Sequence, residues 1–370
     1  MEDDIQLPLS SSPSLHLAHP NPTESRLICH QTAPDWKDAL SLPQYLEEYE
    51  FLLTAPLARN NGITPWILVD RNQAEDKRTI LASCETFRKR ALVGDPDGNV
   101  TDVIAHGIAS VYCHEPLRKR GYASRFLREL GDVLPGWQVD NNTSVAASIL
   151  YSDIDPGFYR SLGWMPFASD QLEFKPSSIT HNGTLLHAED LAALCEKDEA
   201  LLRASMSRPS PDKDSTPRFA IFPNHEHILW HHAKEEFGSQ RLLGKTPLIK
   251  GAIAGPAGNR VWAIWTHRFY RHPDVDPSAN TLYILRFVVE SSKAAAEHLC
   301  AVLDAARAEA AEWGMGKVKL WAPESELEDL IKQSGVPFEC KTRVCDSIPC
   351  LRWYSAGSVD WVLSEKYAWC

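Results

Sequence analysis

Three consecutive segments in the first half of the chain, residues 66–70, 79–90 and 100–113, have the apolar patterning of β-strands. The second and third segments are separated by residues 94–98, with the sequence Gly-Asp-Pro-Asp-Gly. Glycine and proline in such a short polar turn are typical of a hairpin. The pattern therefore predicts three strands that form an antiparallel meander.

The segment that follows the meander alternates helices and strands. Residues 123–134 carry apolar side chains at helical spacing, which predicts an amphipathic helix. These apolar positions are Phe126, Leu127, Leu130 and Leu134. A strand is predicted at 145–151, a short helix at 156–162 that ends at Gly163, and a closing strand at 171–175. Together these elements predict an α+β domain in which helices flank a mixed sheet.

The second half of the chain repeats this order of elements without a recognisable sequence repeat. Strands are predicted at 261–267 and 281–289, a long helix at 293–313, a strand at 317–321 and a helix at 324–333. Strands that alternate with helices indicate an α/β arrangement. The second half therefore predicts another domain, of related α/β architecture.

Length and polarity set the predicted domain boundaries. A chain of 370 residues is long for a single hydrophobic core, so two domains are expected. Residues 1–25 are rich in serine and proline and predict a flexible tail. We place the first domain at 26–178 and the second at 179–370, with a polar, proline-rich mobile loop at 203–218.

The overall composition is that of a soluble globular protein. Hydrophobic residues make up 44% of the chain, and no stretch approaches the ~20 apolar residues that a membrane span needs. The net charge of −11 argues against a non-specific nucleic-acid binder. Nine dispersed cysteines indicate reduced thiols. These features predict a cytoplasmic protein without nucleic-acid or membrane partners, and they leave its oligomeric state open.

The turn before the amphipathic helix has the chemistry of a phosphate site. A predicted strand ends at Cys113, and the turn that follows contains Arg118, Lys119 and Arg120. Backbone N–H groups in such a turn and at a helix N-terminus bind anions. Gly121 is small enough for phosphate oxygens to approach the backbone. The turn therefore predicts a pyrophosphate site, although it lacks the Gly-Lys-Ser/Thr of a nucleotide P-loop.

This turn resembles the cofactor loop of the GNAT superfamily of acyl-CoA-dependent N-acyltransferases. The family pattern is Gln/Arg-x-x-Gly-x-Gly/Ala, and Arg118, Gly121 and Ala123 match it. The predicted meander precedes the motif and the long helix follows it, as in the family. Further along, residues 158–164 (Phe-Tyr-Arg-Ser-Leu-Gly-Trp) are similar to the family signature aromatic-Tyr-x-x-x-Gly-aromatic. The resemblance implies an N-acetyltransferase with acetyl-CoA as co-substrate.

A narrower resemblance is to the fungal lysine N6-acetyltransferases of lysine catabolism. It rests on residues 83–87 (Ser-Cys-Glu-Thr-Phe), residues 150–154 (Leu-Tyr-Ser-Asp-Ile) and the additional C-terminal domain. The implied partner is a small-molecule amine, with the ε-amine of L-lysine favoured because a large second domain would roof the site. A polyamine, an amino sugar or a peptide amine are the alternative substrates, and a non-catalytic CoA-binding module is the alternative function.

The family resemblance implies roles for the residues that match its motifs. Tyr159 would protonate the departing CoA thiolate. Backbone groups of Val111 and Cys113 would contact the pantetheine arm, and Phe158 would line the cofactor site. The cofactor loop that would hold the pyrophosphate comprises Arg118, Lys119, Arg120, Gly121, Tyr122, Ala123 and Ser124. The second domain lacks such a loop before its long helix, so one cofactor per chain is expected.

The catalytic base departs from the family pattern, because the position of the usual glutamate falls near Gly107. The candidates left open are His106, Glu85, Asp153 and the terminal carboxylate of Cys370. On the substrate side, Glu85 and Asp153 are candidates for binding an amine. Arg286, which interrupts an apolar strand, is a candidate for binding a carboxylate.

Four histidines between residues 225 and 232 raise the question of a metal site. His227 and His231 would share one face of a helix, but no carboxylate or further ligand completes a zinc-protease pattern. We therefore predict that no metal binds here and that this segment is a helix packed against the first domain.

Overall fold

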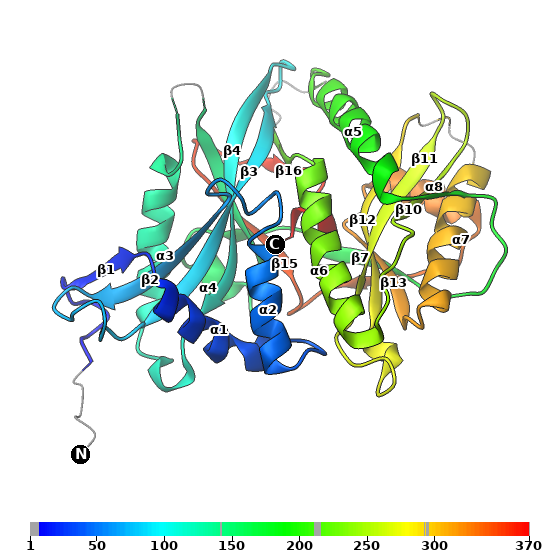
Figure 1. Ribbon diagram of the computed structural model, residues 1–370. Coiled ribbons are helices and arrows are strands. Elements are labelled where there is room, and N and C mark those ends of the chain that lie inside the picture. Colours follow the sequence, from blue (N-terminus) through cyan, green and yellow to red (C-terminus); the bar gives the residue numbers. More distant parts are fainter. Residues whose placement is uncertain (1–6, 141–142, 211–215, 292, 294–295, 370) are drawn as a thin grey trace.

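The computed structural model describes residues 7–140, 143–210, 216–291, 293 and 296–369. These residues form two mixed β-sheets that lie side by side with helices around and between them (Figure 1). The arrangement confirms the predicted combination of a mixed sheet with flanking helices and a second unit of related architecture.

The first sheet contains the predicted meander. In order across the sheet its strands are β1 (Leu15–Ala18), β2 (Ile63–Asp70), β3 (Ala82–Gly94), β4 (Val100–Tyr112), β5 (Val145–Ser152), β15 (Ile348–Trp353) and β6 (Met165–Pro166). Strands β2, β3 and β4 pair antiparallel, whereas β4 and β5 pair in parallel. Of two further short strands, β9 (Arg218–Ile221) pairs alongside the last residues of β3, and β16 (Asp360–Trp361) pairs with β9.

The second sheet repeats this plan. Its strands, in order, are β14 (Glu339–Thr342), β7 (Asp170–Phe174), β13 (Lys317–Trp321), β12 (Thr281–Val289), β11 (Val261–Arg268), β10 (Gly251–Ala254) and β8 (Thr184–Leu186). Strands β10, β11 and β12 form an antiparallel meander, and β12 then pairs in parallel with β13. The crossover helix is α7 (Ala296–Glu312), as α3 (Tyr122–Val133) is in the first half.

Helices other than α3 and α7 occur in both halves. They are α1 (Pro22–Trp36), α2 (Leu42–Leu52), α4 (Gly157–Arg160), α5 (Leu191–Met206), α6 (His225–Leu243) and α8 (Ser325–Ser334). Helix α6 lies between the two sheets in Figure 1 and contacts both α2 and β11. Helix α3 buries the predicted apolar face, including Phe126, Leu127 and Leu130, against the first sheet.

The two halves exchange strands, which the sequence order did not predict. Strand β7 was expected to close the first sheet, but Leu172 and Phe174 are buried in the core of the second. Conversely, β15 lies between β5 and β6, and its residues Ile348 and Cys350 are buried in the core of the first sheet. A boundary after residue 178 therefore does not separate the two sheets.

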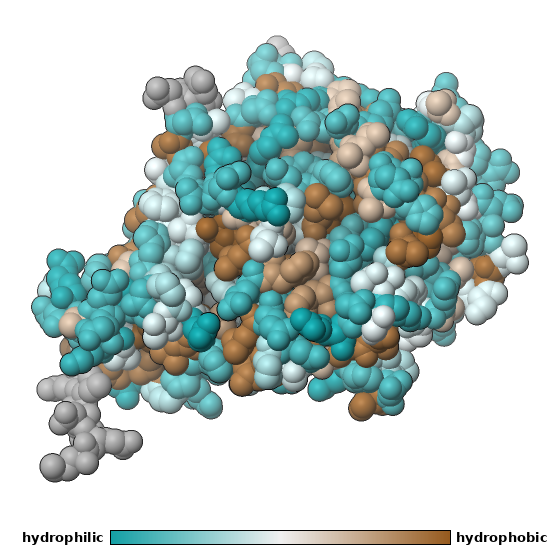
Figure 2. Space-filling model, in the orientation of Figure 1, coloured by the Kyte–Doolittle hydropathy of each residue, from teal (hydrophilic) through white to brown (hydrophobic). Residues whose placement is uncertain are grey.

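A third core joins the halves. It combines Ile149 and Phe219 from the first sheet with Trp262, Ile264 and Leu285 from the second. The face of the molecule in Figure 2 is mostly hydrophilic, with apolar side chains gathered in patches near its middle. Among the described residues, none of the helices is long and apolar enough to cross a membrane.

The described part of the predicted N-terminal tail is folded. Strand β1 pairs antiparallel with β2, and Leu15 is buried in the first core. Helix α1 begins with a capping box, in which Asn21 Oδ1 accepts from the backbone of Glu24 at 2.9 Å and Glu24 Oε2 accepts from the backbone of Asn21 at 2.8 Å. Arg78 Nε donates to Glu24 at 2.7 Å. Serine and proline form turns and the start of a helix here, so the prediction of a flexible tail from composition was wrong.

The predicted mobile loop at 203–218 is shorter in the structure. Helix α5 continues through Arg203 to Met206, and Arg218 begins β9. Arg203 forms a two-pronged contact with Asp102, with Nη1 to Oδ2 at 2.8 Å and Nη2 to Oδ1 at 2.6 Å. The ends of the segment therefore belong to regular elements, and residues 211–215 lie outside the described residues.

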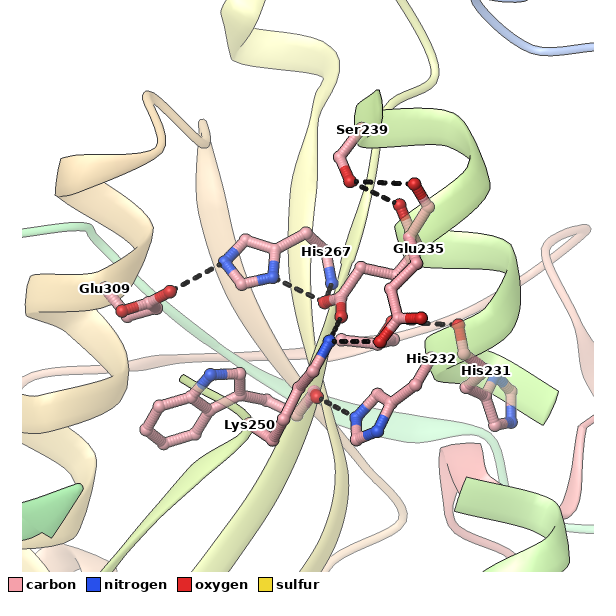
Figure 3. A network of polar contacts seen from close by, with 10 residues as sticks. His231, His232, Glu235, Ser239, Lys250, His267 and Glu309 are labelled. Atoms are coloured by element: carbon pink, nitrogen blue, oxygen red, sulfur yellow. Dashed lines mark hydrogen bonds and ion pairs between the residues drawn. The ribbon is translucent and has the colours of Figure 1, made fainter. Parts of the chain in front are cut away.

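The histidines of α6 take part in internal packing. His231 Nε2 is 3.2 Å from the carbonyl oxygen of Tyr367, and His232 Nε2 is 2.9 Å from that of Trp265. One turn later, Glu235 enters a buried charge network that links three elements (Figure 3). These contacts join α6 to β11 and to the C-terminal segment.

The network in Figure 3 is centred on a histidine between two carboxylates. His267 Nδ1 is 2.6 Å from Glu235 and its Nε2 is 3.3 Å from Glu309, while Lys250 also contacts Glu235. Burial opposes ionisation, but the hydrogen bond from His267 and the charges of His267 and Lys250 hold the pKa of Glu235 at about 2. The network therefore keeps its charges paired inside the second half.

Candidate active site

Strands β4 and β5 separate at the point where the candidate site forms. They pair in parallel up to Ile108 and Leu150, and both continue beyond that pair. In the part of β4 that no longer pairs with β5, Ser110 has a φ of 53°, and the register with β3 shifts between Ser83 and Glu85. A bulge of this kind disrupts the ladder locally and leaves backbone groups unpaired. The ends of β4 and β5 therefore no longer pair with each other.

A cavity of about 650 Å³ occupies this divergence. Its walls come from β3, β4 and β5, from α1 and α2, and from elements of the second half. The second half contributes Trp230, Lys234, Arg268 and Trp369. Both halves of the molecule thus enclose one site.

One end of the cavity meets the predicted cofactor loop. Arg118 and Ala123 line this end, together with Val111 and Cys113. Gly121 is the N-cap of α3 with a φ of 85°, a backbone conformation that favours glycine. Because glycine has no side-chain acceptor, the first N–H groups of α3 are left for a ligand. The backbone at this helix start has the geometry of an anion site, and its binding of a pyrophosphate stays a prediction.

The side chains of the cofactor loop lie in different surroundings. Arg118 Nε donates to the backbone carbonyl of Cys113 at 2.9 Å, which ties the loop to the end of β4. The Tyr122 side chain is buried, and its hydroxyl donates to the carbonyl of Pro8 at 2.5 Å. Only the backbone of Tyr122 is therefore open to a cofactor. The remaining predicted members are exposed or half-buried, and they are Lys119, Arg120 and Ser124.

Tyr159 and Phe158, from the short helix α4, also line the cavity. The ring of Tyr159 packs in the first core with only 8% of the residue exposed. Burial raises the pKa of the Tyr159 hydroxyl well above its usual value, so it stays protonated at neutral pH. Tyr159 is thus a cavity residue whose hydroxyl carries its proton at neutral pH.

Glu85 is the carboxylate most closely tied to the bulge. It lies on β3, lines the cavity, and its Oε2 accepts from Ser110 Oγ at 3.3 Å. Burial raises the pKa of Glu85, although hydrogen bonds from Tyr49 and Ser110 favour the charged form. A carboxyl group with a raised pKa is better matched to exchange protons near neutral pH.

Comparison with known proteins identifies the family. Residues 168–370, more than half of the chain, match the family described as "LYC1 GNAT-like C-terminal domain". The chain belongs to this LYC1-like GNAT family. A protein named lysine acetyltransferase, from Yarrowia lipolytica (strain CLIB 122 / E 150), is 23% identical over 378 residues, covering 90% of each chain. The GNAT protein described here is therefore an acyltransferase, as its sequence motifs predicted.

Solved structures show a similar fold for this GNAT enzyme. A GCN5-related N-acetyltransferase from Anabaena variabilis has a TM-score of 0.52 at 13% identity, covering 91% of this chain and 72% of that chain. A GCN5-related N-acetyltransferase from Kribbella flavida has a TM-score of 0.51 at 14% identity, covering 92% of this chain and 71% of that chain. These likenesses confirm the predicted GNAT-like fold.

The other candidate bases of the GNAT enzyme differ in position. Asp153 lines the cavity, and its Oδ1 accepts from the backbone of Ser347 at 2.8 Å. His106 does not line the cavity, because its ring is buried and its Nε2 is 3.1 Å from the carbonyl oxygen of Trp137. Burial lowers the pKa of His106 to about 4. Cys370 lies outside the described residues.

Arg286 lies outside the cavity, which corrects its predicted role in substrate binding. Its Nε and Nη2 each donate to Asp198 at 2.8 Å, and its Nη1 contacts Glu365. All three side chains are at most 10% exposed. The arginine that interrupts the apolar strand therefore has internal partners, and the sequence showed the need for a partner without showing its source.

We expect Arg286→Met to destabilise the fold and to leave the Michaelis constant of the amine unchanged. Removing one partner leaves buried carboxylates unpaired, which costs about 3–5 kcal/mol of unfolding free energy. Urea unfolding followed by circular dichroism measures this change. Arg203→Met, which breaks a partly exposed pair with Asp102, is the control and should cost at most about 1 kcal/mol. An Arg286 variant of normal stability with a raised KM would return Arg286 to the substrate site.

Several residues of the cavity were not predicted from the sequence. Glu48 lies in a run of acidic residues on α2, yet it is only 4% exposed and contacts Lys234. Tyr49 comes from the same helix and bonds to Glu85. Lys234, Arg268 and Trp369 lie far along the chain, and no motif marks them. A clue for Glu48 was its place beside apolar positions of the same helix.

Proposed function

We propose that this GNAT enzyme transfers an acetyl group from acetyl-CoA to the ε-amine of L-lysine. The observation that carries the proposal is one cavity in which a fitting cofactor loop, Tyr159 and Glu85 meet. The choice of lysine is supported by the relative from Yarrowia lipolytica that is named a lysine acetyltransferase. With lysine as substrate, the reaction would serve lysine catabolism in the cytoplasm.

Acetyl-CoA, the acetyl donor that GNAT acetyltransferases use, would supply the thioester that is cleaved. The N–H groups at the start of α3 would hold its pyrophosphate, with Arg118 nearby. Backbone groups of Val111 and Cys113, beyond the bulge at Ser110, would bind the pantetheine arm, and an N–H group there would stabilise negative charge on the carbonyl oxygen. This arrangement needs no metal.

Glu85 is proposed to accept the proton that the amine must lose. A lysine ε-amine has a pKa of about 10.4, so it is almost fully protonated at neutral pH. Glu85 lies on the strand next to the bulge, and its raised pKa makes it a better base than an exposed carboxylate. Tyr159 is proposed to donate a proton to the thiolate as the C–S bond breaks.

The walls that the second half adds to the cavity favour a small amine over a peptide segment. Side chains from the second half, including Trp230 and Trp369, form part of its walls. A volume of about 650 Å³ that must hold part of acetyl-CoA as well as the acceptor leaves little room for a protein substrate. Polyamines and amino sugars are the competing small substrates.

The test is turnover with a panel of amines. Purified protein is incubated with acetyl-CoA and L-lysine, a polyamine, an amino sugar or a lysine-containing peptide. Thiol release is measured and the products are identified by mass spectrometry. We expect N6-acetyl-lysine to be the main product. Turnover only with another amine would remove lysine as the substrate, and CoA binding without any turnover would favour a non-catalytic module.

A further inference from the structure

The cavity contains three basic side chains in different situations. Arg118 lies at the cofactor end and binds the backbone of Cys113. Lys234 contacts Glu48. Arg268 comes from the last position of β11, so the second half of the molecule provides it. The three cations therefore do not form one phosphate site, and Arg268 needs an explanation of its own.

The guanidinium of Arg268 has unused donor capacity. Nη2 is 2.5 Å from Asp38 Oδ2, and the guanidinium lies over the rings of Tyr270 and Trp369 at 5.5 and 5.8 Å. Its Nε is buried and has no hydrogen-bond partner among the described residues. An arginine carries five N–H donors in a planar fork that matches a carboxylate. A buried donor without a partner is costly, so a ligand that supplies an acceptor would relieve the cost.

A buried carboxylate lines the same cavity as this arginine. Glu48, on α2, and Arg268, on β11, are both lining residues, and α6 contacts both of these elements. Glu48 is 4% exposed and also contacts Lys234. The cavity therefore presents a positive group that Asp38 holds in place and a negative group that Lys234 holds in place. This pattern is complementary to a zwitterion, in which a carboxylate and an ammonium group are attached to one carbon.

We propose that Arg268 binds the α-carboxylate of a free amino-acid substrate and that Glu48 faces its α-ammonium group. The inference rests on the proposed function, because it assumes that the cavity receives an amine for acetylation. It narrows the substrate to α-amino acids with a side-chain amine and disfavours polyamines and peptide-bound lysine. It also gives the second half a specific task, which is to select the head group of the substrate.

The first experiment changes the ligand and leaves the protein intact. Binding of L-lysine, pentane-1,5-diamine and 6-aminohexanoate to the full-length, CoA-loaded protein is measured by calorimetry. Pentane-1,5-diamine is lysine without its carboxylate, and 6-aminohexanoate is lysine without its α-amine. We expect the diamine to bind roughly tenfold to a hundredfold more weakly than lysine, because a charge-assisted hydrogen-bonded pair is lost.

The second experiment changes the arginine. Arg268→Met should weaken lysine and 6-aminohexanoate binding by roughly tenfold to a hundredfold and change diamine binding less than threefold, which removes the preference. Arg268→Lys, which keeps the charge without the fork, should fall between wild type and Arg268→Met. Arg241→Met is the matched control, since Arg241 pairs with Glu47 outside the cavity and should leave all three affinities unchanged.

The outcomes separate this inference from the proposed function. A diamine that binds as tightly as lysine to wild-type protein would overturn the inference, and so would an equal loss of all three ligands in Arg268→Met protein that still binds CoA normally. Acetylation is assayed in parallel with the same amines. Selective lysine binding without turnover would support the role of Arg268 while removing the proposed activity. Turnover of lysine and the diamine at equal kcat/KM would support the proposed activity while removing the role of Arg268.

Discussion

Replacing Tyr159 with phenylalanine is expected to lower kcat by roughly 10²- to 10⁴-fold, the range for loss of a general acid. The substitution removes one oxygen from a ring that stays packed in the first core. CoA affinity should therefore be unchanged, and the loss should appear in kcat as well as in kcat/KM. Steady-state kinetics with the preferred amine and a CoA-binding titration measure the two quantities.

Tyr354→Phe is the matched control for this prediction. The Tyr354 hydroxyl donates to Ser148 at 2.8 Å and does not line the cavity, so its removal should leave kcat within about threefold of wild type, as for a single neutral hydrogen bond. If Tyr159→Phe retained full activity, the departing thiolate would have to be protonated by water or by another group, and the proposed acid would be wrong.

Replacing Glu85 with glutamine is expected to lower kcat/KM at neutral pH by roughly 10²- to 10⁴-fold. Glutamine has nearly the same size and can still accept from Ser110, but it cannot take a proton from the amine. Glu47→Gln, which alters an exposed carboxylate paired with Arg241, is the control and should have no effect. Retained activity in the Glu85 variant would move the base to Asp153 or to another group.

The dependence of kcat/KM on pH provides a second test of Glu85 as the base. Burial raises its pKa above the ordinary value, so the base becomes active only as pH rises through that raised value. In wild-type enzyme kcat/KM should therefore fall on the acid side at a pH above the usual glutamate range. Glu85→Gln should lose this acid limb and keep the limb that belongs to the substrate amine, near pH 10.4.

The raised pKa of Glu85 that favours proton transfer also lowers the stability of the folded protein at high pH. A buried Glu85 whose folded pKa is raised binds its proton more tightly in the folded state. Its contribution to stability is therefore greatest below the unfolded pKa and is lost as pH rises through the folded pKa. Glu85→Gln should be relatively more stable than wild type above that range. The group would thus combine a cost in stability with a gain in proton transfer.

The geometry of the proposed cofactor loop could be predicted from sequence because it is local. The turn, the glycine N-cap and the first turn of α3 lie within residues 118–124, so one motif specifies the whole cradle. Tyr159 could be predicted for the same reason, since its signature is a short helix that ends near Gly163. Both depend on backbone geometry that neighbouring residues determine.

The substrate side could not be predicted because its residues come from distant parts of the chain. Glu48, Lys234 and Arg268 meet only when α2, α6 and β11 pack around the cavity. Arg286 misled for a related reason: an arginine in an apolar strand must have partners, but sequence does not show whether these are substrate or protein. The prediction of a flexible N-terminal tail was wrong because its serines and prolines form turns around a short paired strand.

The insertion of β15 beside β5 has a consequence for how the molecule is made. Ser152 pairs with Ile348, and every strand of the second sheet lies between them in the sequence. The ribosome must therefore synthesise nearly the whole chain before the strand next to β5 exists. Contacts between such distant residues are slow to form because a long loop must close first. The first sheet is thus completed only after the segments of the second half have been synthesised, and a chain that stalls before residue 348 carries an open sheet edge beside β5.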